Sequence, residues 1–320
     1  MAHAHDAASA RLPSPESPTA RIAVIGDALI DELRDPHGSR EFVGGAALNV
    51  AVGLALLGEQ ATLVAMVGDD EPGERIRGYL RDYRVGLVES PSPLGTSRAI
   101  SDRTEGEPRY EFNEAAKRRS IRFDPSVRSA IDEADLVVVS CFPFDDDAQY
   151  AELVAAIADP SQRVIVDGNP RAGMLADRER FLANFEGFAS RSLLVKVGDE
   201  DAELLLGESL DVFVERLLAS GAPAVLATAG RDGATLHHEG KPVHTPIVPL
   251  PGSVIDTMGA GDATLSAMVR RIAVDGLPAT NASWAHAMHE AMVIAAATVR
   301  CEGALLRMPH EHAAEPAFPS

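Results

Sequence analysis

The chain contains, towards its C-terminal end, the stretch Val254-Ile255-Asp256-Thr257-Met258-Gly259-Ala260-Gly261-Asp262-Ala263. Its two leading apolar residues are typical of the end of a strand, and a helix is predicted from Ala260 to about Val274. Between them, Gly259 and Gly261 carry no side chain, so backbone N–H groups can approach a ligand closely. The dipole of the following helix favours negative charge at this position. The stretch therefore predicts an anion-binding turn.

Asp262 places a carboxylate next to the expected anion. A bound phosphate would repel this carboxylate, which indicates that Asp262 serves a second reactant as a proton acceptor. An anion site with a neighbouring base predicts a phosphoryl transferase. The simpler alternative is a helix start with an acidic cap and glycines that only let the chain turn.

The composition is that of a globular protein with no electrostatic preference for polyanions. The 320 residues suffice for one large α/β domain or two ordinary ones, and 46% hydrophobic residues supply a sizeable core. The formal net charge of −19 argues against nucleic acid or membrane partners, because both would repel the protein. No apolar run approaches the roughly 20 residues that cross a bilayer. The two cysteines, Cys141 and Cys301, lack metal-ligand spacing. We expect a cytoplasmic protein with free thiols.

Apolar runs and helical patterns alternate along the chain. Buried strands are predicted at 22–26, 61–66, 136–140, 164–167, 193–195 and 224–228. Helices are predicted at 46–57, 72–82, 146–158, 177–188, 211–220, 260–274 and 282–300. Continuous apolar strands separated by helices indicate a mainly parallel sheet with helices on both faces.

Two polar segments, about 31–43 and 94–114, interrupt this alternation. The second carries alternating runs such as 97–101 and 109–112, which are typical of half-buried antiparallel strands. We infer a small β lid assembled from both segments, with two surface hairpins without a ligand as the alternative. Exposed strand edges of such a lid would offer a route to a homodimer.

The domain itself is expected to span residues 21–309. Three prolines stand among serines and alanines within residues 1–20, a composition that cannot bury enough apolar surface to become ordered. We therefore expect a disordered tail at 1–20 and a similarly loose C-terminus at 310–320.

Polar residues follow several predicted strands, at the edge where open α/β sheets bind ligands. Asp31 can accept hydrogen bonds from vicinal hydroxyls, or serve only as a turn residue. Gly44 and Gly45 let a ligand lie against the backbone, and Asn49 offers a donor and an acceptor to a sugar hydroxyl. Tight packing of helix on sheet is the alternative there. Arg171 has the planar fork that suits a phosphate, although an ordinary surface arginine would look the same.

Two further loops are candidates to border a nucleotide. Lys196 follows the strand predicted at 193–195, and Thr228-Ala229-Gly230-Arg231-Asp232-Gly233 follows the strand at 224–228.

In their order, these motifs resemble the PfkB or ribokinase family of carbohydrate kinases, from Arg21 to about Pro309. The glycine pair with Asn49 resembles the first family signature, and Asp256 to Asp262 resembles the second. The resemblance implies a ribokinase-like fold, in which a mainly parallel sheet has helices on both faces and a small β lid.

The resemblance also implies roles for the residues of the two signatures. Asp262 becomes the expected catalytic base, and the N–H groups of Gly259, Ala260 and Gly261 become the expected anion hole for the transferred phosphoryl group. ATP and Mg²⁺ are the implied cofactors, and a potassium ion near Asp256, completed by carbonyls around 301–303, is common in the family. Sugar contacts are implied for Asp31, Gly44, Gly45 and Asn49, phosphate contacts for Arg171, and nucleotide contacts for Lys196, Thr228, Gly230 and Gly233.

Positions 198 and 201 depart from the family pattern. After the lysine, the family usually has Asn or Ser and, three residues later, Glu, a motif that organises metal and phosphate. This chain has Gly198 and Asp201. The shorter carboxylate is expected to reach Mg²⁺ through water, since this ion usually keeps several waters. Met258 also replaces the usual small polar residue.

Several functions remain open at this stage. Fructose is the first choice of acceptor, because 107–112 resembles fructokinase-like members. A phosphosugar kinase would need a basic acceptor pocket, and a nucleoside kinase is a further alternative. Gly198 and Asp201 raise the alternative of a catalytically silent sugar- or nucleotide-binding protein of the same fold, against which the intact Asp262 and its glycines argue. The candidates for a basic pocket are Arg98, Arg103 and Arg109.

Overall fold

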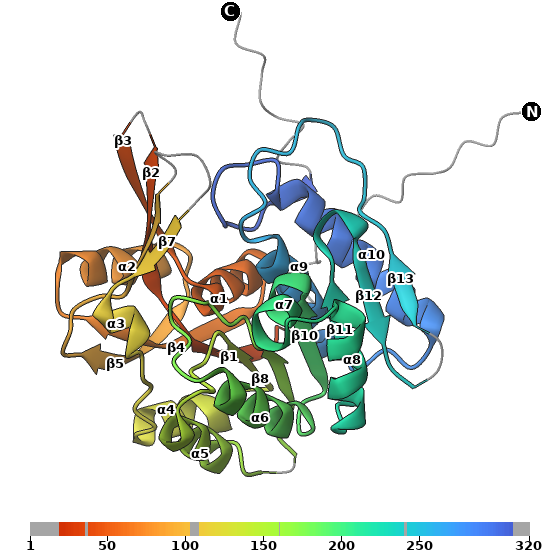
Figure 1. The fold of residues 1–320 in the computed structure, drawn as a ribbon, viewed down its shortest axis with the longest axis horizontal. Coiled ribbons are helices and arrows are strands. Elements are labelled where there is room, and N and C mark those ends of the chain that lie inside the picture. The colour runs from red at the N-terminus through yellow and green to blue at the C-terminus, as the bar shows by residue number, and fades with distance from the viewer. Residues whose placement is uncertain (1–18, 36–37, 103–108, 160, 240–241, 310–320) are drawn as a thin grey trace, which may run out of the picture.

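The structure, a computed structural model, describes residues 19–35, 38–102, 109–159, 161–239 and 242–309. Its main element is a nine-stranded sheet in the order β13-β12-β11-β10-β9-β8-β1-β4-β5 (Figure 1). The strands from β5 to β11 in this order pair in parallel, and β12 and β13 add an antiparallel edge. Their bounds are β1 Arg21–Gly26, β4 Gln60–Gly68, β5 Gly86–Ser92, β8 Leu136–Ser140, β9 Val164–Asp167, β10 Leu194–Gly198, β11 Val225–Thr228, β12 Ala234–His237 and β13 Val243–Thr245.

Strand β1 shows why helices cover both faces. Ile22 and Val24 enter one apolar core, whereas Ala23 and Ile25 enter the other. Successive side chains of a strand point to opposite faces, so an all-apolar strand needs a cover on each face. One cover consists of α1 (Ala46–Leu56), α2 (Glu71–Asp82), α9 (Ala260–Asp275) and α10 (Asn281–Thr298). The other consists of α4 (Pro125–Asp132), α5 (Asp147–Ala156), α6 (Arg178–Ala189), α7 (Asp199–Leu206) and α8 (Leu210–Ala219). The predicted fold class is confirmed.

A second, smaller sheet is formed by the two polar segments that predicted a lid. Its order is β3-β2-β6-β7, in which β2 and β6 are parallel and both outer pairs are antiparallel. Since β2 follows β1 almost directly, this sheet grows from the carboxyl edge of the main sheet, and β2 and β3 project beside α2 (Figure 1). The bounds are β2 Leu29–Asp35, β3 Gly38–Gly44, β6 Arg98–Asp102 and β7 Arg109–Phe112.

One predicted strand end is wrong. Val254 and Ile255 lie in a segment without regular structure, and they are 59% and 65% exposed. The N–H groups of Ile255 and Asp256 both donate to the carbonyl oxygen of Val299, just after α10. The segment therefore contacts the end of a helix instead of pairing with a strand. Two apolar residues before a turn do not indicate this long-range contact.

Several elements were not predicted. Strand β5 contains Glu89, Ser90 and Pro91, which weaken the apolar pattern, but as the last strand of the sheet it tolerates a proline. The others are β12, β13, α4, α7 and the short α3 (Glu114–Lys117). Of the tail predicted at 1–20, residues 1–18 lie outside the described residues, as do 310–320 and Arg103. Ala20, in contrast, is buried, and its N–H donates to Oε2 of Glu59 at 2.7 Å. Within the described part of the chain, no helix has the length and apolar character needed to cross a membrane.

Candidate active site

Two helices that begin on glycines bring the two signature stretches together. Gly45, the residue before α1, has φ 112°, and a Cβ there would lie 2.9 Å from the carbonyl oxygen of Asp27. Gly259, before α9, has φ 76°, and a Cβ there would overlap the backbone of Ala304. The amide nitrogen Nδ2 of Asn49 on α1 donates to Oδ2 of Asp262 on α9 at 2.9 Å. This hydrogen bond joins residues 213 positions apart in the sequence.

The first turn of α9 is the place at which the anion hole is predicted. The first N–H groups of an α-helix have no acceptor within the helix, so those of Gly261 and Asp262 face outward from its N-terminus. The N–H of Ala260 already makes a long bond of 3.3 Å to the carbonyl oxygen of Thr257. Gly261 and Asp262 are therefore the better amide donors of this turn.

Asp256 links the turn before α9 to the loop after α10 by hydrogen bonds. Its two carboxylate oxygens accept hydrogen bonds from the N–H of Met258 at 3.0 Å and the N–H of Gly303 at 3.1 Å. The loop that was expected to complete a potassium site thus lies beside Asp256. Among the described residues there is no group of three or more His, Cys, Asp or Glu side chains that could hold a metal ion. A potassium site built from backbone carbonyls remains a prediction.

A buried ion pair lies against the same turn. Nζ of Lys196 is 3.1 Å from each carboxylate oxygen of Asp167. The two residues are register partners on β10 and β9, and they are 5% and 0% exposed. A Cβ on Gly261 would lie 3.3 Å from both Cε and Nζ of Lys196, so the ammonium group sits beside the first turn of α9.

Carboxylates lie near one another around Asp31 and Asp262. Asp31 on β2 is half-buried, and its Oδ2 occupies the space that a Cβ of Gly44 would need. Burial raises the pKa of Asp31 to about 7, and the charges of Asp27 and Asp262 add to this effect. Burial likewise raises the pKa of Asp262 to about 6, against the opposing effects of Asn49 and nearby cations. At neutral pH both carboxyl groups are near their titration range.

Asp201 caps its own helix. Its Oδ2 accepts a hydrogen bond from the N–H of Gly198 at 2.8 Å, and burial raises its pKa to about 6, although Lys196 opposes the shift. Arg171 lies close by: its Nη1 is 4.0 Å from Oε2 of Glu200 on the same helix. Its charge lowers the pKa values of Asp201 and Asp262 and also those of Asp27 and Asp31, so Arg171 lies near both groups of carboxylates.

The three remaining nucleotide candidates lie at the end of β11 and in the turn that follows it. Oγ1 of Thr228 donates to the carbonyl oxygen of Val197 at 3.2 Å, next to the end of β10. Gly230 and Gly233 have φ 47° and 88°, and a Cβ on Gly233 would overlap the backbone of Thr245. The turn into β12 therefore needs Gly233 whether or not a nucleotide binds.

The basic acceptor pocket considered for a phosphosugar is not supported by Arg98. Its Nη1 lies 2.6 Å from Oε1 of Glu41 and 3.9 Å from Oε2 of Glu32, so its charge is already neutralised within the small sheet. The reason is the pairing of β2 with both β3 and β6, which places these side chains together.

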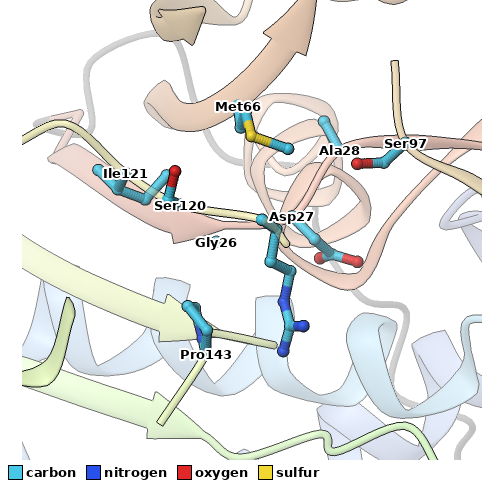
Figure 2. A pocket seen from close by; sticks show the side chains of 9 residues that line it. Gly26, Asp27, Ala28, Met66, Ser97, Ser120, Ile121 and Pro143 are labelled. Carbon is cyan, nitrogen blue, oxygen red and sulfur yellow. The ribbon is translucent and has the colours of Figure 1, made fainter. Parts of the chain in front are cut away.

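Asp27 and Asp167 were not among the predicted site residues, although both directly follow or end a strand at the carboxyl edge. Oδ1 of the buried Asp27 accepts a hydrogen bond from the N–H of Ala47 at 3.0 Å, at the start of α1. A cavity of about 10 Å³ lies beside Asp27, with Met66 and Ser97 on its wall (Figure 2). This volume suits a single water molecule and not a sugar.

The fold and the site together define a class of protein. At the start of α9, a carboxylate and free amide groups lie beside a buried lysine, at the carboxyl edge of a ribokinase-like sheet. This arrangement is typical of a sugar kinase. The chain belongs to the pfkB family of carbohydrate kinases, whose family model matches residues 19–311. It is a phosphotransferase with an alcohol group as acceptor.

Known proteins resemble this chain over most of its length. A fructokinase of Klebsiella pneumoniae is 26% identical over 310 residues, which cover 91% of this chain and 97% of that protein. A fructokinase variant from Vibrio cholerae, solved with fructose, ADP and potassium, has a TM-score of 0.73 at 22% identity, over 90% of this chain and 95% of that one. An aminoimidazole riboside kinase from Salmonella enterica gives 0.71 at 22% identity, over 91% and 97%. The two structures share the fold of this chain.

Proposed function

We propose that this kinase transfers the γ-phosphoryl group of ATP to a hydroxyl of an uncharged sugar, with fructose as the first acceptor to test. The observation that carries the proposal is the hydrogen bond from Asn49 to Asp262 at the start of α9. It brings together a residue suited to a sugar hydroxyl, a carboxylate suited to a proton, and free amides suited to a phosphoryl group.

In this proposal the acceptor hydroxyl lies between Asp262 and the γ-phosphorus. The oxygen of the hydroxyl forms the new bond to phosphorus while the bond to the bridging oxygen breaks, and ADP leaves with that electron pair. The hydroxyl proton passes to Asp262, and the N–H groups at the start of α9, those of Gly261 and Asp262 first among them, stabilise charge on the phosphoryl oxygens. In a loose transition state little proton removal is needed early, so the position of Asp262 matters more than its basicity.

The charges around the acceptor favour an uncharged sugar. The charges of Asp27 and Asp262 both raise the pKa of Asp31, whereas that of Arg171 lowers it. A second phosphate group on the acceptor would meet this negative charge, and Arg98 is held by Glu41. Sugar contacts are assigned to the Asp31 carboxylate, the Asn49 amide and the backbone at 44–45. Fructokinase relatives support a hexose, whereas the riboside kinase neighbour keeps pentoses and nucleosides as the second choice.

The cofactor assignment follows the donor side of the site. ATP phosphates are assigned to the α9 turn, Lys196 and Arg171, with the nucleoside bordered by Thr228, Gly230 and Gly233. Mg²⁺ usually binds through one or two carboxylates together with phosphates and water, and the Asp201 oxygen that does not cap α7 fits this pattern. When bound, the ion neutralises developing charge on the phosphate oxygens. A potassium ion is assigned to the loops joined by Asp256.

The test is an ADP-release screen with Mg²⁺ and ATP. The acceptors are hexoses, pentoses, nucleosides and sugar phosphates, each measured with and without potassium. The proposal expects turnover with an uncharged sugar and little with its phosphate esters. Preference for a phosphosugar would overturn the charge argument, and silence with every acceptor would favour a binding protein of this fold.

A further inference from the structure

The cavity of about 10 Å³ adjoins the backbone to which the sugar is assigned. A Cβ on Gly45 would lie 2.9 Å from the carbonyl oxygen of Asp27 and 3.0 Å from Cα of Ala28, and both of these residues line the cavity. Ser97, also in the wall, accepts a hydrogen bond through its carbonyl oxygen from the N–H of Ile30 on β2, at 2.9 Å. The cavity is therefore continuous with two elements that are assigned to the acceptor.

The wall of the cavity is polar in one part and apolar in another. Asp27 contributes a carboxyl group and Arg119 a guanidinium group. Apolar side chains of Met66, Ile121 and Pro143 line the remainder, and Figure 2 shows them around Asp27. Ligand sites commonly combine an apolar lining with a few polar groups that fix orientation. A sugar carbon with its hydroxyl group has the same two parts, one that forms hydrogen bonds and one that does not.

The half-buried Arg119 carries a charge that no carboxylate neutralises directly. Among the described residues, no carboxylate oxygen lies within the 4.0 Å of an ion pair with it. Its Nε donates to the carbonyl oxygen of Cys141 at 3.2 Å, and its Nη1 is 3.5 Å from the carbonyl oxygen of Ala116. These contacts hold the guanidinium group in place but occupy only part of its five N–H donors.

The charge of Arg119 acts on the carboxyl group that shares the cavity. Burial raises the pKa of Asp27, and the charge of Arg119 opposes this effect. Oδ1 of Asp27 also accepts the hydrogen bond from the N–H of Ala47, which fixes the carboxyl group at the start of α1. A donor and an acceptor are thus held beside a space that admits a single oxygen atom.

We propose that the cavity is a hydroxyl subsite for the acceptor sugar and that Arg119 is its specificity-determining residue. One sugar hydroxyl occupies the cavity, accepts a hydrogen bond from the guanidinium group of Arg119 and donates one to the carboxyl group of Asp27. This inference deepens the proposed function and rests on it, because the sugar is placed at Gly45 by that assignment. A phosphate group, with three terminal oxygens, does not fit the volume, so the guanidinium group selects a hydroxyl.

Binding of sugar without nucleotide tests the subsite independently of turnover. D-fructose and its 1-, 3-, 4- and 6-deoxy analogues are titrated by calorimetry into the wild type and into Arg119→Met. A site that bonds a substrate hydroxyl rejects the analogue that lacks it, so one analogue should bind the wild type about 10-fold or more weakly than fructose. In Arg119→Met, fructose and this analogue should bind nearly alike, while the other analogues keep their differences. If Arg119→Met changes the penalty of no analogue, the cavity holds only water and the subsite is refuted.

The neighbouring Arg118 provides a matched control. Its side chain is 73% exposed, and its Nε is 3.4 Å from Oε2 of Glu114. Arg118→Met removes a positive charge from the same segment and should leave every affinity unchanged. Should Arg119→Met fail to fold, Arg119→Lys replaces it, because lysine keeps the charge but lacks the planar fork. The penalty of the selected analogue should then fall several-fold, and an unchanged penalty would overturn the contact.

These measurements also separate the two proposals. If the wild type binds fructose but phosphorylates no acceptor, the proposed function fails, and the comparison with Arg119→Met still decides whether the subsite exists. If another sugar is preferred in the ADP-release screen, that sugar and its deoxy analogues take the place of fructose. Turnover without any coupling between Arg119 and a hydroxyl refutes the subsite alone. A protein that neither binds nor phosphorylates any sugar of the screen overturns both proposals.

Discussion

The two halves of the site, the proposed acceptor half and the proposed donor half, differ in the charged side chains that they contain. On the acceptor half, at the ends of β1 and β2 and the start of α1, carboxylates lie near one another and their pKa values are raised. On the donor half, at β9, β10 and the start of α9, a buried lysine is fixed by two contacts of 3.1 Å. Asp262 lies between the two halves. It accepts a hydrogen bond from Asn49, and the charge of Lys196 lowers its pKa.

This difference suggests a division of labour. A surplus of carboxylates suits the hydroxyl groups of a neutral sugar, which donate hydrogen bonds to them. A fixed cation and free amides suit a phosphate. A protein with a net charge of −19 must bring cations to ATP locally. The cations of the donor half are Lys196, which pairs with Asp167, and Arg171, which pairs with Glu200. The predictions below disturb one half at a time.

The largest effect on turnover is expected at Asp262, which lies between the two halves. Asp262→Asn keeps the shape of the side chain but removes the proton acceptor, so kcat should fall on the order of 10³-fold while sugar and nucleotide still bind. In the wild type, kcat/KM should rise with pH through about 6, where Asp262 becomes ionised. Turnover and calorimetry measure both. Asp275→Asn, at the exposed far end of the same helix, is the control. Near-native turnover of Asp262→Asn would remove the base assignment.

The next effect comes from the backbone of the donor half. Gly259→Ala should lower stability by about 1–3 kcal/mol, because φ is 76° and the new Cβ would overlap the backbone of Ala304. The displaced turn should also lose most of its turnover. Gly276→Ala is a matched control at the other end of α9, since φ is 80° there but nothing lies within 4 Å of the new Cβ. It should reduce stability alone. Thermal unfolding and kcat distinguish the two, and equal activity in both variants would contradict the anion-hole role.

Asp31→Asn tests the acceptor half and its dependence on pH. The pKa of Asp31 is raised in the folded state to about 7, so between about pH 4 and 7 the folded protein binds more protons than the unfolded chain. Stability therefore decreases with rising pH in this window, and the carboxylate destabilises the ligand-free protein above it. Asp31→Asn should raise the melting temperature at pH 8, with no gain near pH 4. It should also raise KM for the sugar about 10-fold.

The adjacent Glu32 is a control, because its pKa is shifted in the opposite direction to that of Asp31. Hydrogen bonds from Arg34 and Ser39 hold the pKa of Glu32 below its usual value. Its contribution to stability is present above the unfolded pKa and is lost as the pH falls. Glu32→Gln should therefore lower the melting temperature at pH 8, where Asp31→Asn raises it. If both variants shifted in the same direction, the charge crowding on the acceptor half would be refuted.

Local sequence patterns predicted most of the strands and helices, but they did not predict contacts between segments that are distant in the sequence. The apolar run of β1 and the alternation with helices predicted the parallel sheet, because a strand buried on both faces has its own composition. The same logic failed for Val254 and Ile255, whose partner is the end of α10. It also missed β5, where the polar residues and Pro91 of an edge strand hide the pattern.

The site follows the same rule. Gly259, Gly261 and Asp262 lie within four consecutive residues, so the turn itself predicted their chemistry. The pairing of Lys196 with Asp167 depends on the register of β9 and β10, which no local pattern contains. That Asp201 accepts a hydrogen bond from the N–H of Gly198 likewise required coordinates. Sequence patterns therefore indicated which groups are present, and the structure determined which of them face one another.

The smallest effect is expected from restoring the side chain that the donor half lacks. Gly198 has φ −115°, and a Cβ there would make ordinary contacts of 3.5 Å with Oγ1 of Thr228 and 3.6 Å with Oδ2 of Asp201. Gly198→Asn should therefore change stability by less than about 0.5 kcal/mol. If Lys196 already supplies the charge, kcat should change little, whereas the same substitution should partly rescue Lys196→Met. Gly207→Asn, at the other end of α7, is the control that should rescue nothing. A large gain of kcat from Gly198→Asn in the wild type would instead show that the donor half is incomplete, and that the fixed lysine does not compensate for the missing side chain.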